Sequence, residues 1–322
     1  MKGMYKIGGN DLNREVHHRG MLLCIGMIIV GVCLFFNAAS GIASYWNRNS
    51  ENQEQADMAG EGGGQVDLAE KSRPESQDQQ ALASVQEALA SGNDLDLADS
   101  SEKIKYIQSH TASYPEELLS LLSRNVETVD FVYSYPELVK AGLNTEDAAE
   151  QVHLTEDELK SDHPLFLQWD TRWGAIPYGS SMMALSGCGP TCLSMVAVAL
   201  TGNEDATPAA VAMYAMQQGY YTEGAGTAWS LMTEGCTNYG LHSRDLALTE
   251  EDMVQKLQDG CMLICSVSPG DFTQTGHFIV IYGYEDGWFE INDPNSVSNS
   301  SARWKFDRLK GQIRNIWALS AV

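Results

Sequence analysis

Apolar and polar positions divide the chain into three blocks that predict different kinds of structure. An uncharged run covers residues 20–47, and its core at 21–36 is almost entirely apolar. A polar stretch follows it to about residue 100, and recurring apolar positions then continue to the C-terminus. A helix that spans a membrane needs about 20 apolar residues. The first block therefore predicts a transmembrane or signal-anchor helix over residues 21–46.

The flanks of this apolar run indicate its orientation. Four basic residues precede it: Lys2, Lys6, Arg14 and Arg19. Positive charge marks the cytoplasmic side, so residues 1–20 predict a cytoplasmic tail, and Tyr45 and Trp46 are expected to anchor the outer end. The alternative is a cleaved signal peptide, because Ala38 and Ala39 are small enough for a cleavage site.

The apolar run continues past these small residues, which favours a single-pass protein of the cell membrane over a protein that is secreted after signal cleavage. In both cases the remainder of the chain is expected to be extracytoplasmic. Residues 47–100 contain too few large apolar side chains to form a core. They predict a disordered acidic spacer that holds the rest of the chain away from the membrane.

The next block, residues 101–162, carries signals of short helices. Ser113 and Glu116 have the spacing of a capping box, with a proline between them. Thr155 and Glu158 repeat that spacing. Short helices need a partner surface, so the block predicts a helical pre-region that packs on the domain after it. A separate small helical bundle is the alternative.

Residues 163–322 combine helical and strand patterns. Helices are predicted at 190–202, 207–218 and 249–258. Strands rich in β-branched and aromatic residues are predicted at 261–267, 277–284 and 288–293. Helices that come first and strands that come later favour an α+β domain over alternating βαβ units.

Composition excludes one class of partner. The chain has 43 acidic and 20 basic residues and a formal net charge of -23. This field repels nucleic acid, so no nucleic-acid partner is expected. Five of the seven cysteines lie outside the predicted membrane helix: Cys188, Cys192, Cys236, Cys261 and Cys265. An odd number in an exported segment leaves at least one thiol unpaired, and such a thiol is a candidate reactive group.

Cys188 is the candidate nucleophile. It lies in Gly-Cys-Gly-Pro at 187–190, at the start of a predicted helix. There the helix dipole and free N–H groups stabilise a thiolate, and a neighbouring N–H can face an oxyanion. The alternative is a buried structural cysteine. Cys192, one turn later, is expected in the core. The two cysteines lack a second pair of metal ligands, so neither a metal nor a cofactor is expected.

His277 is the candidate base, because it opens a predicted strand that leads into a hairpin. Residues 285–287 fit a three-residue hairpin loop that ends in a left-handed glycine. Such a loop pairs Tyr284 with Trp288 and sets Asp293 diagonally across from His277, on the same face. Asp293 is therefore expected to orient the imidazole.

A slip of one residue would present Asn292 to His277 in place of Asp293. In the register chosen here, the inward face also carries four apolar residues: Ile279, Ile281, Phe289 and Ile291. That shared apolar face favours Asp293.

Four motifs then occur in an order typical of a known family. They are Gln-Trp-Asp-Thr-Arg-Trp-Gly at 168–174, Gly-Cys-Gly-Pro at 187–190, Gly-His-Phe at 276–278 with Gly-Tyr at 283–284, and Asn-Asp-Pro at 292–294. From residue 164 onward, about half of the chain resembles the peptidase-like family related to bacteriocin-processing, double-glycine-cleaving cysteine peptidases of the papain-like superfamily. The resemblance implies a papain-like fold, in which a helix that carries the cysteine packs on an antiparallel sheet.

The resemblance also implies site residues. Its Cys-His-Asp triad corresponds here to Cys188, His277 and Asp293, and its oxyanion-hole glutamine to Gln168. In the alternative, Gln168 only tethers its loop. Four aromatic residues either line a substrate groove or pack in the core: Trp169, Trp173, Tyr178 and Trp229.

These observations predict a membrane-anchored, extracytoplasmic cysteine peptidase that hydrolyses amide bonds through a thioester. Bacteriocin processors are cytoplasmic domains fused to a transporter, so their leader-cleaving role is not expected here. Expected substrates are proteins, peptides or cell-wall peptides. The N-terminal helix is expected to insert into the membrane. Two alternatives stay open: a catalytically silent surface binding module of the same fold, and a cell-wall amidase or endopeptidase. Residues 48–162 either inhibit the enzyme as a pro-region or space it from the membrane.

Overall fold

A computed structural model of the protein describes residues 97–322. These residues belong to the second of two compact units of the chain, Arg73–Val322. The predicted cytoplasmic tail, the predicted membrane helix at 21–46 and almost all of the predicted spacer lie outside the described residues. Within residues 97–322, no helix is both long and apolar enough to cross a membrane.

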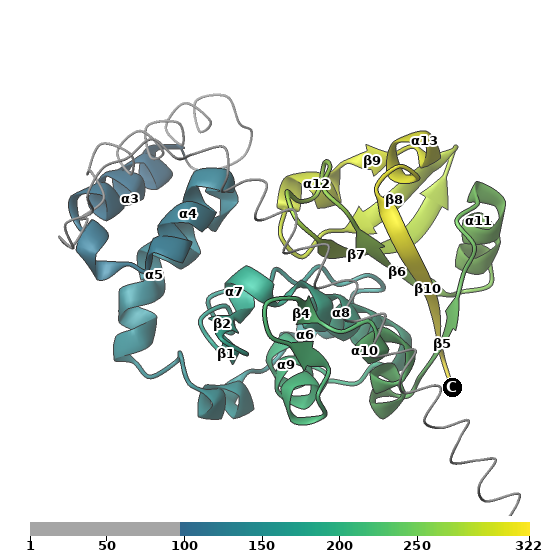
Figure 1. Ribbon diagram of the computed structural model, residues 1–322, viewed down its shortest axis with the longest axis horizontal. Helices are drawn as coiled ribbons and strands as arrows, with labels where there is room; N and C mark the ends of the chain where they lie inside the picture. Colours follow the sequence, from purple (N-terminus) through teal and green to yellow (C-terminus); the bar gives the residue numbers. More distant parts are fainter. Residues whose placement is uncertain (1–96) are drawn as a thin grey trace, which may run out of the picture. The chain divides into compact units, whose positions relative to one another are not determined.

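A helical segment precedes the mixed domain (Figure 1). Its α-helices are α3 (Leu97–Ser109), α4 (Glu116–Arg124), α5 (Val129–Lys140) and α6 (Glu156–Lys160). Three 3-10 turns join them: η1 (Thr111–Ser113), η2 (Val126–Thr128) and η3 (Glu146–Gln151). The predicted capping box of α6 is confirmed, because the Thr155 hydroxyl accepts the Glu158 N–H and the Glu158 carboxylate accepts the Thr155 N–H.

The predicted capping box at the start of α4 is wrong. Ser113 ends η1, and α4 begins at Glu116 with Pro115 in the cap position and no side-chain cap hydrogen bond. A proline keeps the residue before it out of the α region, and Tyr114 is accordingly extended. Pro115 is not helical either, with a ψ of 142°, so the helix starts at Glu116.

A six-stranded antiparallel sheet forms one layer of the mixed domain. Its strands are β5 (Leu241–Asp245), β6 (Met262–Val267), β7 (His277–Glu285), β8 (Trp288–Asn292), β9 (Arg303–Trp304) and β10 (Ile313–Ala321). They lie in the order β5-β10-β6-β7-β8-β9, so the last strand inserts between β5 and β6. Two short hairpins lie outside this sheet: β1 (Pro177–Tyr178) with β2 (Ser181–Met182), and β3 (Tyr221–Thr222) with β4 (Gly226–Thr227).

Helices cover both faces of the sheet. The helices of the mixed domain are α7 (Met183–Ser186), α8 (Cys188–Thr201), α9 (Pro208–Gln217), α10 (Ser230–Thr233), the 3-10 helix η4 (Gly235–Tyr239), α11 (Glu250–Gln258), α12 (Val297–Ser301) and α13 (Phe306–Leu309). One apolar core joins α8 and α9 to the sheet, and a second joins α11 and α13 to it. The domain is thus α+β, with the cysteine-bearing helix against an antiparallel sheet.

Helix α8 is the central helix of the domain. Every residue from Gly189 to Val198 is buried, which is typical of a helix surrounded by core on all sides. The helix ends at Gly202, whose φ of 66° gives the left-handed cap that stops it. Phe278 and Val280 of β7 share its apolar core. This packing holds the start of α8 beside the start of β7.

The hairpin between β7 and β8 differs from the prediction at its tip. The predicted three-residue loop is wrong, because Glu285 pairs with Trp288 and leaves a loop of two residues, Asp286 and Gly287. Their φ values are 51° and 80°. Positive φ at both central residues is what a tight type I′ turn needs.

A bulge further down the hairpin compensates for the shorter loop. The register shifts between Ile281 and Gly283, as happens when one strand carries an extra residue. Below the bulge, Val280 pairs with Asn292. The shorter loop and the bulge shift the register in opposite directions by one residue each. Below the bulge the pairing is therefore the predicted one, and Asp293 lies where it was expected relative to His277.

The helical segment and the mixed domain share an apolar core. Phe131 of α5 packs in one cluster with Leu118 of α4 and with Trp169 and Ala184, which precede α8 in the chain. Gly174 lies so close to Phe131 that a Cβ there would be 2.7 Å from its ring. Apolar contacts therefore fix α4 and α5 against the residues that lead to Cys188.

Replacing Phe131 with alanine should lower the free energy of unfolding by about 3–5 kcal/mol, because a cavity opens in this shared core. The ring is 1% exposed, whereas Val139 on the same helix is 39% exposed. Val139→Ala should cost less than about 1 kcal/mol. Urea unfolding followed by tryptophan fluorescence measures both values, and equal losses would contradict the shared core.

Candidate active site

Cys188 is the first residue of α8, and its side chain is half-buried. The N–H groups of the first helical turn have no partner inside the helix, so they favour negative charge at this position. Gly189 lets strand β4 approach closely, since a Cβ there would be 2.6 Å from Thr227 Oγ1. The sulfur of Cys188 is thus partly accessible to a ligand, although the start of the helix around it is closely packed.

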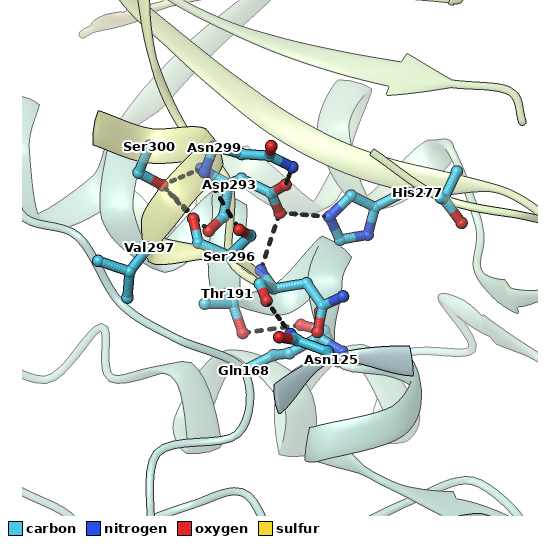
Figure 2. Close-up of polar contacts among 12 residues, drawn as sticks. Asn125, Gln168, Thr191, His277, Asp293, Ser296, Val297, Asn299 and Ser300 are labelled. Atoms are coloured by element: carbon cyan, nitrogen blue, oxygen red, sulfur yellow. Dashed lines mark hydrogen bonds and ion pairs between the residues drawn. The ribbon is translucent and has the colours of Figure 1, made fainter. Parts of the chain in front are cut away.

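His277 opens β7, and Asp293 directly follows β8. The His277 Nε2 atom is 2.7 Å from Asp293 Oδ1 (Figure 2). His277 is 7% exposed and Asp293 is fully buried. Cys188 lines the same cleft as His277 and lies close enough to raise the pKa of its ring. Because Nε2 is engaged with Asp293, Nδ1 is the ring nitrogen that remains for the sulfur.

The electrostatics of this trio raise the pKa of His277. Burial by itself lowers that pKa, because it disfavours the charged ring. The Asp293 charge and hydrogen bond outweigh burial, and the contact with Cys188 raises the pKa further. The pKa of His277 therefore lies well above the ordinary value of about 6.5, and the ring is an imidazolium at neutral pH.

Asn292 does not take the place of Asp293. Its Nδ2 donates to the Pro164 carbonyl at 3.0 Å and to the His163 carbonyl at 3.3 Å. The Asn292 side chain thus holds the segment that enters the domain, while the carboxylate one residue later contacts His277.

Several further groups fix the Asp293 carboxylate (Figure 2). Its Oδ1 accepts the Asn295 N–H at 2.8 Å, and its Oδ2 accepts Asn299 Nδ2 at 2.8 Å. The Asp293 N–H donates to Ser300 Oγ at 2.9 Å. A carboxylate held by donors on both oxygens keeps its orientation toward His277.

Gln168 is buried between the segment after Asp293 and the segment before Cys188. Its backbone N–H donates to the Pro294 carbonyl at 2.7 Å, and its Nε2 donates to the Ala184 carbonyl at 2.8 Å. The side chain therefore does tether its loop. A side-chain amide carries two N–H donors, so this tether leaves the second one for another acceptor.

Cys188, His277 and Gln168 line one cleft of about 810 Å³. Its walls come from the end of α4, the hairpin of β3 and β4, and the loop before β7, with lining residues that include Leu121, Arg124, Tyr221, Gly226, Phe272 and Thr275. A cleft of this size can take a drug-sized ligand or a short peptide segment.

The four aromatic residues considered from the sequence divide between cleft and core. Trp229 lines the cleft and is 50% exposed, whereas Trp169, Trp173 and Tyr178 are buried. The Tyr178 hydroxyl is 2.8 Å from Thr227 Oγ1. Burial raises the pKa of Tyr178, and the nearby Cys188 adds to that rise.

Sequence reasoning missed the residues of α12 that hold Asp293, namely Asn299 and Ser300. A local signal for their helix was present, because Ser296 and Asn299 have the spacing of an N-cap. The Ser296 hydroxyl does accept the Asn299 N–H, at 3.1 Å. That signal predicts the start of α12, although it says nothing of which residue the helix contacts.

Comparisons with known proteins bear on the same segment. The family model described as the Peptidase C39-like family matches residues 160–321, just over half of the chain and the part that contains Cys188, His277, Asp293 and Gln168. Among solved structures, the peptidase domain of Streptococcus ComA, a bifunctional ABC transporter involved in a quorum-sensing pathway, is similar over 49% of this chain and 98% of its own. That likeness has 20% sequence identity and a TM-score of 0.36. No curated protein matches the chain.

Replacing Asp293 with asparagine should lower the pKa of His277, because it removes the negative charge that raises this pKa. The native ring therefore keeps its proton as the pH rises, and the variant ring loses it at a lower pH. NMR titration of the His277 ring protons measures the midpoint. Asp307→Asn removes an exposed carboxylate on α13 and should leave the midpoint unchanged, while an unchanged midpoint in D293N would contradict the account.

Proposed function

Because the chain belongs to the Peptidase C39-like family, we propose that it is a cysteine peptidase in which Cys188, His277 and Asp293 hydrolyse amide bonds. The family supports a function of the cysteine peptidase type. One observation carries the assignment of residues: His277 hydrogen-bonds to the buried Asp293 carboxylate, and Cys188 at the start of α8 lies close enough to raise the pKa of the same ring. Nucleophile, base and orienting acid thus lie together, as covalent catalysis needs.

The first half of the reaction forms a thioester. In the resting pair His277 already holds the proton of Cys188 as an imidazolium, whose charge Asp293 stabilises. The sulfur attacks the carbonyl carbon of the substrate, and an electron pair moves onto the carbonyl oxygen. When the C–N bond breaks, the imidazolium gives its proton to the leaving amine.

The second half releases the acid. His277, now neutral, removes a proton from water as the water oxygen attacks the thioester carbonyl. The C–S bond breaks, the carboxylic acid leaves, and the proton held by His277 restores the resting pair with Cys188. The sum is hydrolysis of one amide bond by one water.

The oxygen that becomes negative in both halves needs donors. The free N–H groups at the start of α8 supply one kind of donor. The second N–H of the Gln168 amide supplies another, while the first stays on the Ala184 carbonyl. Gln168 is buried, so its donor acts in a site shielded from water.

We further propose that this reaction takes place outside the cytoplasm. The apolar run at 21–46, with basic residues before it, supports a single-pass anchor whose outer side carries the peptidase domain. Substrates on that side are proteins, peptides or cell-wall peptides. Zymograms with casein or purified cell wall, with Cys188→Ser as the blank, distinguish these classes.

Cys188 should react with iodoacetamide faster than the other four cysteines among the described residues. All five are free, and burial raises the pKa of the others: Cys192, Cys236, Cys261 and Cys265. Peptide mapping after brief labelling at a series of pH values measures each rate.

The selective labelling of Cys188 should disappear in His277→Ala and persist in His242→Ala, which removes an exposed histidine on β5. If Cys188 reacts no faster than Cys192 or than a free thiol peptide, the enzymatic proposal fails.

Gln168→Met should lower kcat by about 100-fold with little change in KM, because methionine keeps the side-chain length but has no donor for the oxyanion. Steady-state kinetics on a cleaved peptide separate the two constants. A rise in KM with kcat unchanged would instead assign Gln168 to substrate binding.

A further inference from the structure

We propose that Glu127, which precedes the family-matched residues, is a positioning residue for Asp293. On this proposal the helical segment 97–160 is a working part of the active site and is not a removable pro-region. The inference rests on the proposed function in one respect, since it concerns the same catalytic acid.

Glu127 lies in η2, and its carboxylate receives hydrogen bonds from the start of α12. Oε2 accepts the Val297 N–H at 2.6 Å, and Oε1 accepts the Ser298 N–H at 3.0 Å. The hydroxyls of Ser296 and Ser298 also donate to Oε1. These N–H groups are ones that a helix cannot satisfy within itself, so the carboxylate fixes the place where α12 begins.

Helix α12 in turn holds the catalytic acid. Asn299 donates to Asp293 Oδ2, and the Ser300 hydroxyl accepts the Asp293 N–H. The helix has five residues, too few for a helix to be stable by itself. Its position therefore depends on outside contacts, and Glu127 supplies charged hydrogen bonds, which are stronger than neutral ones.

A second contact from the same turn supports the other oxygen of the acid (Figure 2). Asn125 Nδ2 donates to the Asn295 carbonyl at 2.6 Å, and the Asn295 N–H donates to Asp293 Oδ1 at 2.8 Å. Asn125 Oδ1 also accepts the Glu127 N–H at 3.1 Å. Asn125 and Glu127 therefore act together: Asn125 holds Asn295, which contacts Oδ1 of Asp293, and Glu127 holds the start of α12, which contacts Oδ2.

The position of the segment relative to the cleft agrees with this role. Leu121, Arg124 and Asn125 line one wall, and Cys188 and His277 line the same open cleft. An inhibitory pro-region would fill the cleft. The helical segment instead borders the cleft. Its removal would release the residues around Asp293 and take away one wall of the cleft.

The test is Glu127→Gln, read first by NMR titration of His277. The amide has one acceptor oxygen, and its NH₂ group cannot accept from a backbone N–H, so α12 loosens and the contact between Asp293 and His277 weakens. Among the described residues, the groups that shift the pKa of His277 are Asp293 and Cys188. The titration midpoint should therefore move to lower pH.

In the same variant, kcat should fall on the order of tenfold to a hundredfold, as expected for a small misplacement of a catalytic group, with KM little changed. The control is Glu137→Gln on α5, which removes an exposed carboxylate paired with Lys140 and should change neither quantity. If E127Q does not fold, Asn125→Ala removes the second anchor and should move the midpoint in the same direction.

A double-variant cycle tests whether Glu127 acts through α12. Asn299→Ala removes the hydrogen bond from α12 to the Asp293 carboxylate, so adding E127Q to N299A should shift the midpoint little further. Shifts that add fully would contradict the proposal, and so would a wild-type midpoint in a folded E127Q.

The titration does not require turnover, which separates the two proposals. If the wild-type protein cleaves nothing but E127Q shifts the midpoint, the positioning role stands and the proposed function fails. If the wild type is active and E127Q matches it in midpoint and kcat, the positioning role fails alone.

Discussion

The contact between His277 and Asp293 constrains much of the rest of the structure. A carboxylate and an imidazolium removed from water are stable only when each has a partner and the remaining donors and acceptors are satisfied. The bulged register of β7 and β8 places Asp293 beside His277. Asn299 then satisfies the second carboxylate oxygen. The geometry of this buried ion pair is thus set by the hairpin of β7 and β8 together with α12.

Elements with short-range signals were predictable from the sequence. The capping box of α6, the glycine stop of α8 and the strand character of β6 each depend on residues a few positions apart. Strand β10 has no such signal, because its register shifts between Ile313 and Asn315 and its buried run of four apolar residues fits a helix equally well. The start of α4 was predicted wrongly because the cap spacing competed with the backbone restriction that Pro115 imposes.

The candidate site shows the same division. Cys188 could be singled out because glycine flanks and a helix start are local features, and Asp293 because two errors in the hairpin cancelled. The link from Glu127 to α12 joins residues 170 positions apart. A sequence without aligned relatives carries no signal of such a contact, so only the folded chain brings the helical segment to the residues that hold Asp293.

The most direct test of the central claim is peptide-library cleavage in ¹⁸O-labelled water, read by mass spectrometry, with the wild-type protein and Cys188→Ser. Hydrolysis through a thioester predicts new C-termini that carry ¹⁸O, formed by the wild type and absent from C188S. Identical peptide profiles for the two proteins, or equal cleavage by C188S, would contradict the account.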